Sequence, residues 1–165
     1  MLNIMQKKDL ESIFHSILSD RGFTKKTGSW YRKTAEALLI VNLQKSSFGN
    51  QYYLNLACVP LALSLPDEPY PKENKCPIRI RLSSAFPEKK AEIESLLDLE
   101  CMALADAERR EKIQMLVEDM LLPFMSQMET KDALISAFNA GKFRRAMVYK
   151  AAQCWIEDRP SGVRH

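Results

Sequence analysis

Two runs of alternating residues on either side of Gly49-Asn50 constrain the fold of this chain more than any other feature of the sequence. A period of two is typical of strands that bury one face, and a Gly-Asn pair suits a tight hairpin turn. We therefore predict an antiparallel hairpin. Its apolar face carries Val41, Leu43, Leu54, Leu56 and Cys58.

The same turn predicts a register for the hairpin. With Gly49 and Asn50 as the two loop residues, Ser46 pairs with Tyr53, Gln44 with Asn55, and Asn42 with Ala57. A slip by one residue would exchange the two faces, so the clean separation of apolar from polar residues supports this pairing.

The remaining patterns indicate an α+β fold. Apolar residues at helical spacing precede Gly22, and β-branched or aromatic residues are frequent in the segments 29–33, 38–46, 52–59 and 78–83. From about residue 88 the spacing is helical again, with a long helix interrupted at Pro123 and two more helices over 131–140 and 145–157. We expect an N-terminal helix, an antiparallel sheet of about four strands, and three to four C-terminal helices packed on the sheet.

Composition favours one globular domain over residues 1–165, because 46% of the residues are hydrophobic and 27% are charged. No signal peptide or membrane-spanning run is evident at the start or elsewhere. The four cysteines are scattered and read as reduced thiols. These features predict a cytoplasmic protein with no membrane association. Between Val59 and Ile78, five prolines predict a long loop of functional or mobile character.

Several short segments resemble a known family. The segments 22–32, 41–46, 52–56 and 80–82, in this order, are similar to the uncharacterised bacterial family called domain of unknown function 4304. The resemblance implies an N-terminal helix, an antiparallel sheet and C-terminal helices in a bacterial intracellular protein. It implies no chemistry. By analogy, some small bacterial families of this kind are immunity proteins that neutralise a toxin.

Residues suited to catalysis or metal binding are scarce. His15 and His165 are the only histidines, and five glycines do not form a phosphate-binding fingerprint. His15 falls on the polar side of the first helix. We therefore expect no metal and no cofactor, and the sequence leans away from an enzyme.

The remaining candidate is the polar face of the sheet. It is expected to carry Asn42, Gln44, Ser46, Tyr53 and Asn55 on the hairpin and Arg79 and Arg81 on the next strand. Amide and guanidinium groups together can bind a peptide, a carboxylate or a phosphate. The alternative is an ordinary solvent-facing sheet, or a polar layer buried under a helix.

Three functions follow from this reading. The leading hypothesis is a non-enzymatic module that recognises another protein, for instance as an immunity-type protein. One alternative is a nucleic-acid-binding domain, because Tyr31, Tyr52 and Tyr53 lie near basic residues, although the acidic segment 88–132 would repel a phosphate backbone. The other is an enzyme that uses Arg79, Arg81 and a carboxylate on a small phosphorylated or carboxylated substrate.

Overall fold

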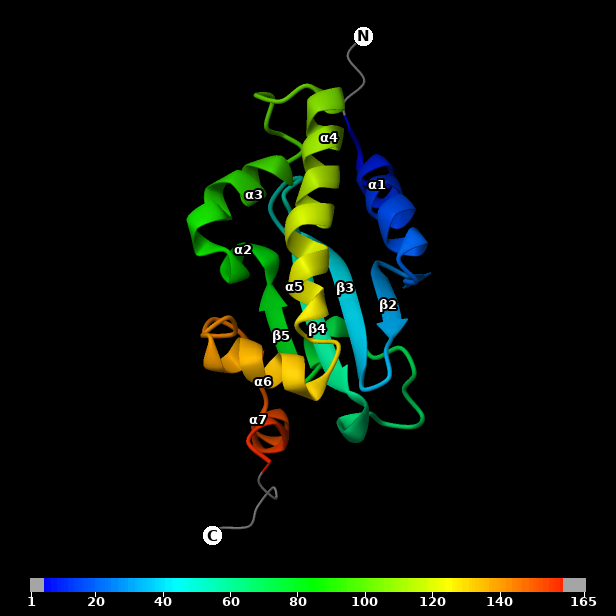
Figure 1. The fold of residues 1–165 in the computed structure, drawn as a ribbon. Coiled ribbons are helices and arrows are strands. Elements are labelled where there is room, and N and C mark those ends of the chain that lie inside the picture. The colour runs from blue at the N-terminus through cyan, green and yellow to red at the C-terminus, as the bar shows by residue number, and fades with distance from the viewer. Residues whose placement is uncertain (1–4, 159–165) are drawn as a thin grey trace.

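The computed structural model describes residues 5–158 as a single antiparallel sheet with helices packed against one face (Figure 1). Each strand pairs with its neighbours in the chain, in the order β1-β2-β3-β4-β5-β6. The strands are β1 (Thr24–Lys26), β2 (Ser29–Lys33), β3 (Ala37–Lys45), β4 (Tyr52–Pro60), β5 (Ile78–Arg81) and β6 (Met147–Val148). The predicted α+β class is confirmed.

The sheet has six strands, and the sequence predicted about four. The two additional strands lie at the edges, where β1 has three residues and β6 only two. Neither is long enough to display a period of two, so pairing with a neighbour creates these strands. β6 also falls inside the segment 145–157 that was predicted to be helical throughout, and the helix there begins only at Lys150.

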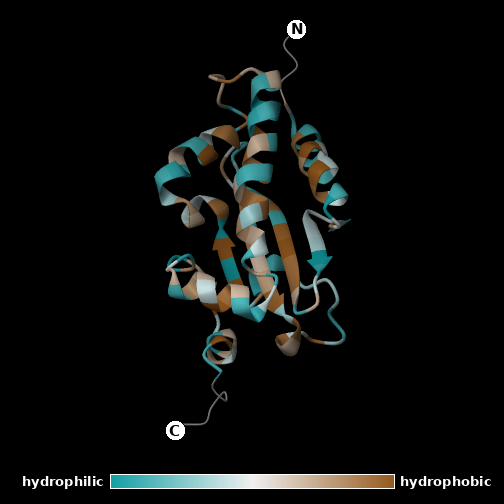
Figure 2. Ribbon diagram, in the orientation of Figure 1, coloured by the Kyte–Doolittle hydropathy of each residue, from teal (hydrophilic) through white to brown (hydrophobic). Residues whose placement is uncertain are grey.

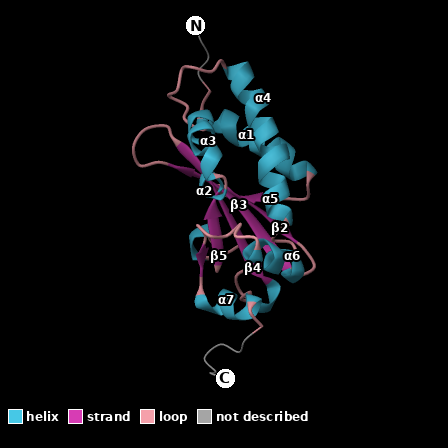
Figure 3. Ribbon diagram, turned by 60° about the vertical axis from the view of Figure 1, so that its left-hand side comes forward, coloured by secondary structure: helices cyan, strands magenta, loops and turns pink. Residues whose placement is uncertain are grey.

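Most helices lie on one side of the sheet, as Figures 1 and 3 show for α1, α4 and α5. The helices are α1 (Lys7–Asp20), α2 (Leu82–Ala85), α3 (Lys90–Leu96), α4 (Asp106–Leu116), α5 (Leu122–Ser126), α6 (Lys131–Asn139) and α7 (Lys150–Ile156). The Thr130 hydroxyl accepts the Ala133 N–H at the start of α6. Gly22 and Gly141 adopt φ of +86° and +77° beyond α1 and α6, as predicted.

A wide turn of π-helix over Val117–Leu121 joins α4 to α5. Pro123 stands in the first turn of α5 and has no N–H to donate to the preceding turn. The helix accommodates this loss by widening before the proline and then continues across the sheet (Figure 1). The interruption predicted at Pro123 is therefore present, and the helical layer remains continuous over the core.

The main core lies between the helices and the inner face of the sheet. β3 is among the most hydrophobic elements in Figure 2. The five residues predicted for the apolar hairpin face, Val41, Leu43, Leu54, Leu56 and Cys58, are all at most 5% exposed and belong to this core. The predicted assignment of the two faces is confirmed.

The predicted hairpin register is wrong by two residues. Asn42 pairs with Asn55 and Gln44 with Tyr53. The Ser46 N–H donates to the Gln51 carbonyl at 2.8 Å, so residues 47–50 form the loop. A shift of two leaves every side chain on its predicted face, because the side-chain period of a strand is two.

A tertiary contact lies beside the longer loop. The Tyr52 N–H donates to the Leu97 carbonyl at 2.9 Å, and the Leu99 N–H donates to the Asn50 carbonyl at 3.1 Å. The segment after α3 is therefore hydrogen-bonded to the end of the hairpin loop and to the start of β4. Gly49 has φ of +81°, a backbone conformation that glycine adopts without the strain that a Cβ would cause.

The outer face of the sheet, opposite the helices, is divided into two halves. The proline-rich segment 61–77 folds across one half and closes a small outer cluster of Tyr31, Leu38, Ile40, Ala57, Val59 and Cys76. The Tyr31 hydroxyl donates to the Pro71 carbonyl at 2.9 Å and fastens the segment to β2. No helix of residues 5–158 covers the other half of the outer face, which carries the polar residues. Within residues 5–158, no helix is long and apolar enough to cross a membrane.

Candidate functional site

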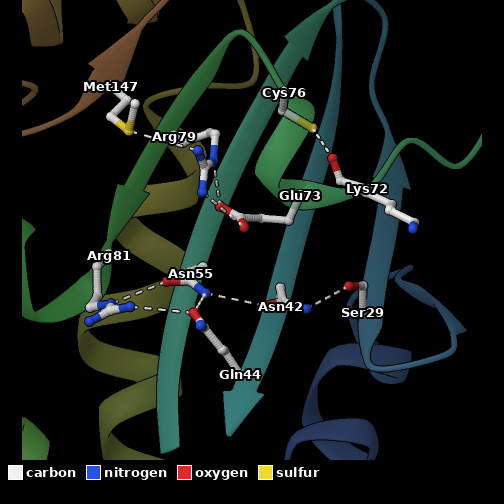
Figure 4. Close-up of polar contacts among 10 residues, drawn as sticks. All are labelled: Ser29, Asn42, Gln44, Asn55, Lys72, Glu73, Cys76, Arg79, Arg81 and Met147. Atoms are coloured by element: carbon white, nitrogen blue, oxygen red, sulfur yellow. Dashed lines mark hydrogen bonds and ion pairs between the residues drawn. The ribbon is translucent and has the colours of Figure 1, made fainter. Parts of the chain in front are cut away.

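A network of side-chain hydrogen bonds crosses β3, β4 and β5 on the open half of the outer face (Figure 4). At its centre, Asn55 Nδ2 donates to Asn42 Oδ1 at 3.2 Å and to Gln44 Oε1 at 2.8 Å. Arg81 donates through Nε to Asn55 Oδ1 and through Nη2 to Gln44 Oε1, both at 3.3 Å. These contacts hold each amide in one orientation.

Tyr53 contacts the network through Arg81. The Arg81 guanidinium lies 4.0 Å from the centre of the Tyr53 ring, within the range of a cation–π contact. Tyr53 is half-buried and Asn55 is 7% exposed, whereas Gln44 is exposed. The polar network therefore joins a buried side chain, Asn55, to an exposed one, Gln44.

Asn42 extends the network to the turn between β1 and β2. Its Nδ2 donates to the Ser29 hydroxyl at 3.0 Å and to the Gly28 carbonyl at 3.3 Å. The preceding residue, Thr27, has φ of +57°, a conformation that β-branched residues rarely adopt. Asn42 thus anchors a strained turn beside the polar face.

Arg79 lies on the same face but binds a different partner. Its Nε donates to Glu73 Oε1 at 3.1 Å, and Glu73 is 7% exposed. Glu73 comes from the proline-rich segment, which brings a carboxylate onto the sheet (Figure 4). Arg79 Nη1 also lies 3.7 Å from the sulfur of Met147 on β6. The pair compensates a buried carboxylate, which would be costly without a partner.

A cleft of about 540 Å³ opens between the polar network and the proline-rich segment. Asn42, Gln44 and Ser29 line one side, and Lys72, Glu73 and Arg79 line the other. Lys26, the last residue of β1, also lines it, with its ammonium group 5.0 Å from the Tyr70 ring centre. The cleft therefore has three cationic side chains and one carboxylate.

Tyr31 forms part of the cleft wall. Burial raises the pKa of Tyr31 above its ordinary value, so the phenol stays protonated and donates to Pro71 across the neutral pH range. The Tyr70 ring meets Tyr31 edge-on with ring centres 5.2 Å apart. These contacts fix the proline-rich segment as one wall of the cleft.

Five of the seven predicted site residues, Asn42, Gln44, Tyr53, Asn55 and Arg81, belong to the polar network. Arg79 is separate because Glu73 engages it. Ser46 is not part of the network, since its hydroxyl accepts the Phe48 N–H within the hairpin loop. Among the described residues no helix covers this polar half, so it is not a polar layer buried under a helix, and it faces solvent as the alternative of an ordinary solvent-facing sheet also expects.

Sequence reasoning missed Lys26, Ser29, Lys72 and Glu73 as members of the site. The sequence pattern could have identified Ser29, because Ser29 lies two residues before Tyr31 on the same face of a correctly predicted strand. The sequence pattern could not have identified Lys72 and Glu73, because only the folding of the proline-rich segment brings them to β3 and β5.

Two aromatic residues proposed for base stacking are buried. Tyr31 is 7% exposed and Tyr52 is 2% exposed, and Tyr52 lies in the main core. His15 is exposed on α1, and its Nδ1 accepts the Trp30 Nε1–H at 3.2 Å. Among residues 5–158, no three His, Cys, Asp or Glu side chains gather closely enough to hold a metal ion.

Comparison with known proteins gives one family. The model described as domain of unknown function (DUF4304) matches residues 14–127. The chain belongs to this family. The DUF4304 match runs from α1 through α5, further along the chain than the resemblance predicted, and contains every residue of the polar network and the cleft. No curated protein and no solved structure matches the chain.

Proposed function

We propose that this DUF4304 chain is a protein-recognition module and that the open half of its outer sheet face is the binding surface. The observation that carries this proposal is the network from Arg81 through Asn55 and Gln44 to Asn42, which ends beside an open cleft. Side chains already held in one geometry lose little conformational entropy on binding, and this favours recognition. An immunity-type protein that neutralises a toxin is one form of such a module.

The chemistry of the cleft supports binding more than catalysis. Its polar groups are amides, hydroxyls and cations, and its carboxylate, Glu73, is bound to Arg79. A general base needs a carboxylate or imidazole within reach of a substrate proton, and the pairing with Arg79 disfavours that role for Glu73.

The nucleic-acid alternative has less support. Tyr31 on this face is buried, whereas Tyr53 and Tyr70 keep accessible surface. The Arg81 guanidinium, however, lies over the Tyr53 ring. Stacking on unpaired bases needs exposed ring faces.

Affinity capture with matched variants tests the proposal. The purified chain is immobilised, exposed to a lysate of the cells that produce it, and compared with a Gln44→Ala/Arg81→Ala double variant. The control is Lys112→Ala on α4, which packs on the opposite face of the sheet. We expect at least one protein that the wild type and the control both capture and the double variant does not. Equal capture of every protein by all three chains would contradict the proposal.

A further inference from the structure

Lys26, Lys72 and the Gln44 amide in the cleft have donor groups with no acceptor among the described residues. The Lys72 ammonium group makes no hydrogen bond or ion pair with residues 5–158, and Lys26 contacts only the face of the Tyr70 ring. Arg79 and Glu73 compensate each other. The excess positive charge of the cleft therefore comes from two lysines that are available to a ligand.

The Gln44 amide adds a directed donor. Its Oε1 already accepts from Asn55 Nδ2 at 2.8 Å and from Arg81 Nη2 at 3.3 Å. The carbonyl end of the amide is thus fixed on the side of Asn55 and Arg81, so the opposite, NH₂ end remains for other acceptors. No acceptor for this NH₂ group lies within hydrogen-bonding distance in the described part of the chain, and Gln44 lines the cleft.

The turn that follows Lys26 is held in a strained conformation. Thr27, the next residue, has φ of +57° and also lines the cleft. Asn42 bonds to Ser29 and Gly28 on the far side of this turn. Strained residues persist where the surrounding structure fixes them, and they gather at ligand sites. Lys26 therefore lies at the cleft directly before a turn that the polar network itself anchors.

We propose that the cleft binds a carboxylate of an acidic segment in a partner protein, with Lys26, Lys72 and the Gln44 amide as its donors. Charge complementarity carries this assignment, because Lys26, Lys72 and the Gln44 NH₂ group are all donors and the excess charge of the cleft is positive. An open cleft in a sheet face suits a side chain projecting from a larger partner. This inference rests on the proposed function and names the chemistry that the partner presents.

The first experiment is an NMR titration of the isotope-labelled full chain. The probe is an eight-residue peptide of alternating Glu and Gly, and the control peptide has Gln in place of every Glu. We expect the acidic peptide to shift the Gln44 side-chain amide signals and the backbone signals of Lys26 and Lys72. We expect the neutral peptide to shift none of them. Added salt should reduce the acidic peptide's affinity because the contacts are exposed.

Variants then test which groups bind. The double variant Lys26→Gln/Lys72→Gln should raise the dissociation constant for the acidic peptide by about tenfold, since two exposed ion pairs are lost. Lys112→Gln removes one exposed lysine from α4 and should leave the affinity unchanged. Equal affinities for the wild type and the double variant would overturn the inference.

A second titration with inorganic phosphate distinguishes binding of a partner's carboxylate from binding of a small free anion. If phosphate shifts the cleft signals and the acidic peptide does not, the assignment to a partner protein is overturned and the cleft is a small-anion site. If neither probe shifts them, the anion chemistry itself is overturned. Both failures differ from that of the proposed function, because capture that depends on Gln44 and Arg81 could still be observed with a partner of other chemistry.

Discussion

Asn55 lies directly opposite Asn42 on the adjacent strand and donates its side-chain N–H to Asn42 Oδ1 at 3.2 Å. This cross-strand amide pair is the junction at which the contacts of Arg81 and Gln44 meet those of the β1–β2 turn. It lies at the boundary between a buried and an exposed surface, because Asn55 is 7% exposed and Asn42 is half-buried.

Replacing Asn55 by Ala should therefore cost about 1–3 kcal/mol of unfolding free energy, since buried or half-buried partners lose their hydrogen bonds. The exposed Gln44→Ala variant should change it by less than about 0.5 kcal/mol. Urea unfolding followed by circular dichroism measures both. Equal losses in the two variants would show that Gln44 is a structural residue and not part of an available face.

The two faces of β3 should differ in the same assay. Leu43 is 5% exposed in the main core, and Leu43→Ala should cost roughly 2–5 kcal/mol through lost burial and a residual cavity. Gln44→Ala, one residue further along, is the matched comparison on the outer face. A loss below about 0.5 kcal/mol for Leu43→Ala would contradict the assignment of the faces.

Thr27→Gly should stabilise the protein. A left-handed backbone costs a residue with a Cβ roughly 1–2 kcal/mol, and the extra entropy of glycine in the unfolded chain offsets roughly 0.5–1 kcal/mol of the gain. We expect a higher melting temperature in differential scanning calorimetry. Thr24→Gly in β1, where φ is not positive, should lower it. A decrease of similar size in both variants would mean that the turn is not strained.

Arg109 is a buried arginine that holds the segment after α3. It is 2% exposed and donates to the carbonyls of Leu96 and Cys101 at 2.6 Å each, and to that of Ser95 at 3.3 Å. Arg109→Ala should cost at least about 1.5–3 kcal/mol, the range for hydrogen bonds to charged groups. The exposed neighbour Arg110→Ala should stay within about 0.5 kcal/mol, and chemical denaturation of both variants distinguishes them. Similar losses would contradict this role.

The thiols should differ sharply in reactivity. A hydrogen bond from the Ser95 hydroxyl lowers the pKa of Cys101, so more of this thiol is thiolate at about pH 8. Burial raises the pKa of Cys58 and of Cys76 to about 12, and Cys154 is buried. Dithionitrobenzoate should therefore modify one thiol rapidly in the native protein and the other three only after unfolding. Cys101→Ser should abolish the rapid phase, and a rapid phase that persists would refute the assignment.

The sequence by itself determined which side chains lie on which face of the hairpin and where α1 and α6 end. These features depend on local rules: the period of two in a strand, the left-handed conformation at Gly22 and Gly141, and the Thr130 cap. The match to DUF4304 confirmed the family resemblance, which also rested on short local segments.

Only the tertiary structure decided the register, the edge strands and the cleft. The Leu97 and Leu99 backbone groups bond to Tyr52 and Asn50 beside the four-residue hairpin loop, and this contact with a segment more than 40 residues later is not recorded in any local pattern. The cleft exists because the Tyr31 hydroxyl fastens a segment 40 residues later in the chain to the sheet and so sets Glu73 on Arg79. Contacts between distant residues depend on the packing of the whole fold, and the spacing of residues along the chain carries no information on them.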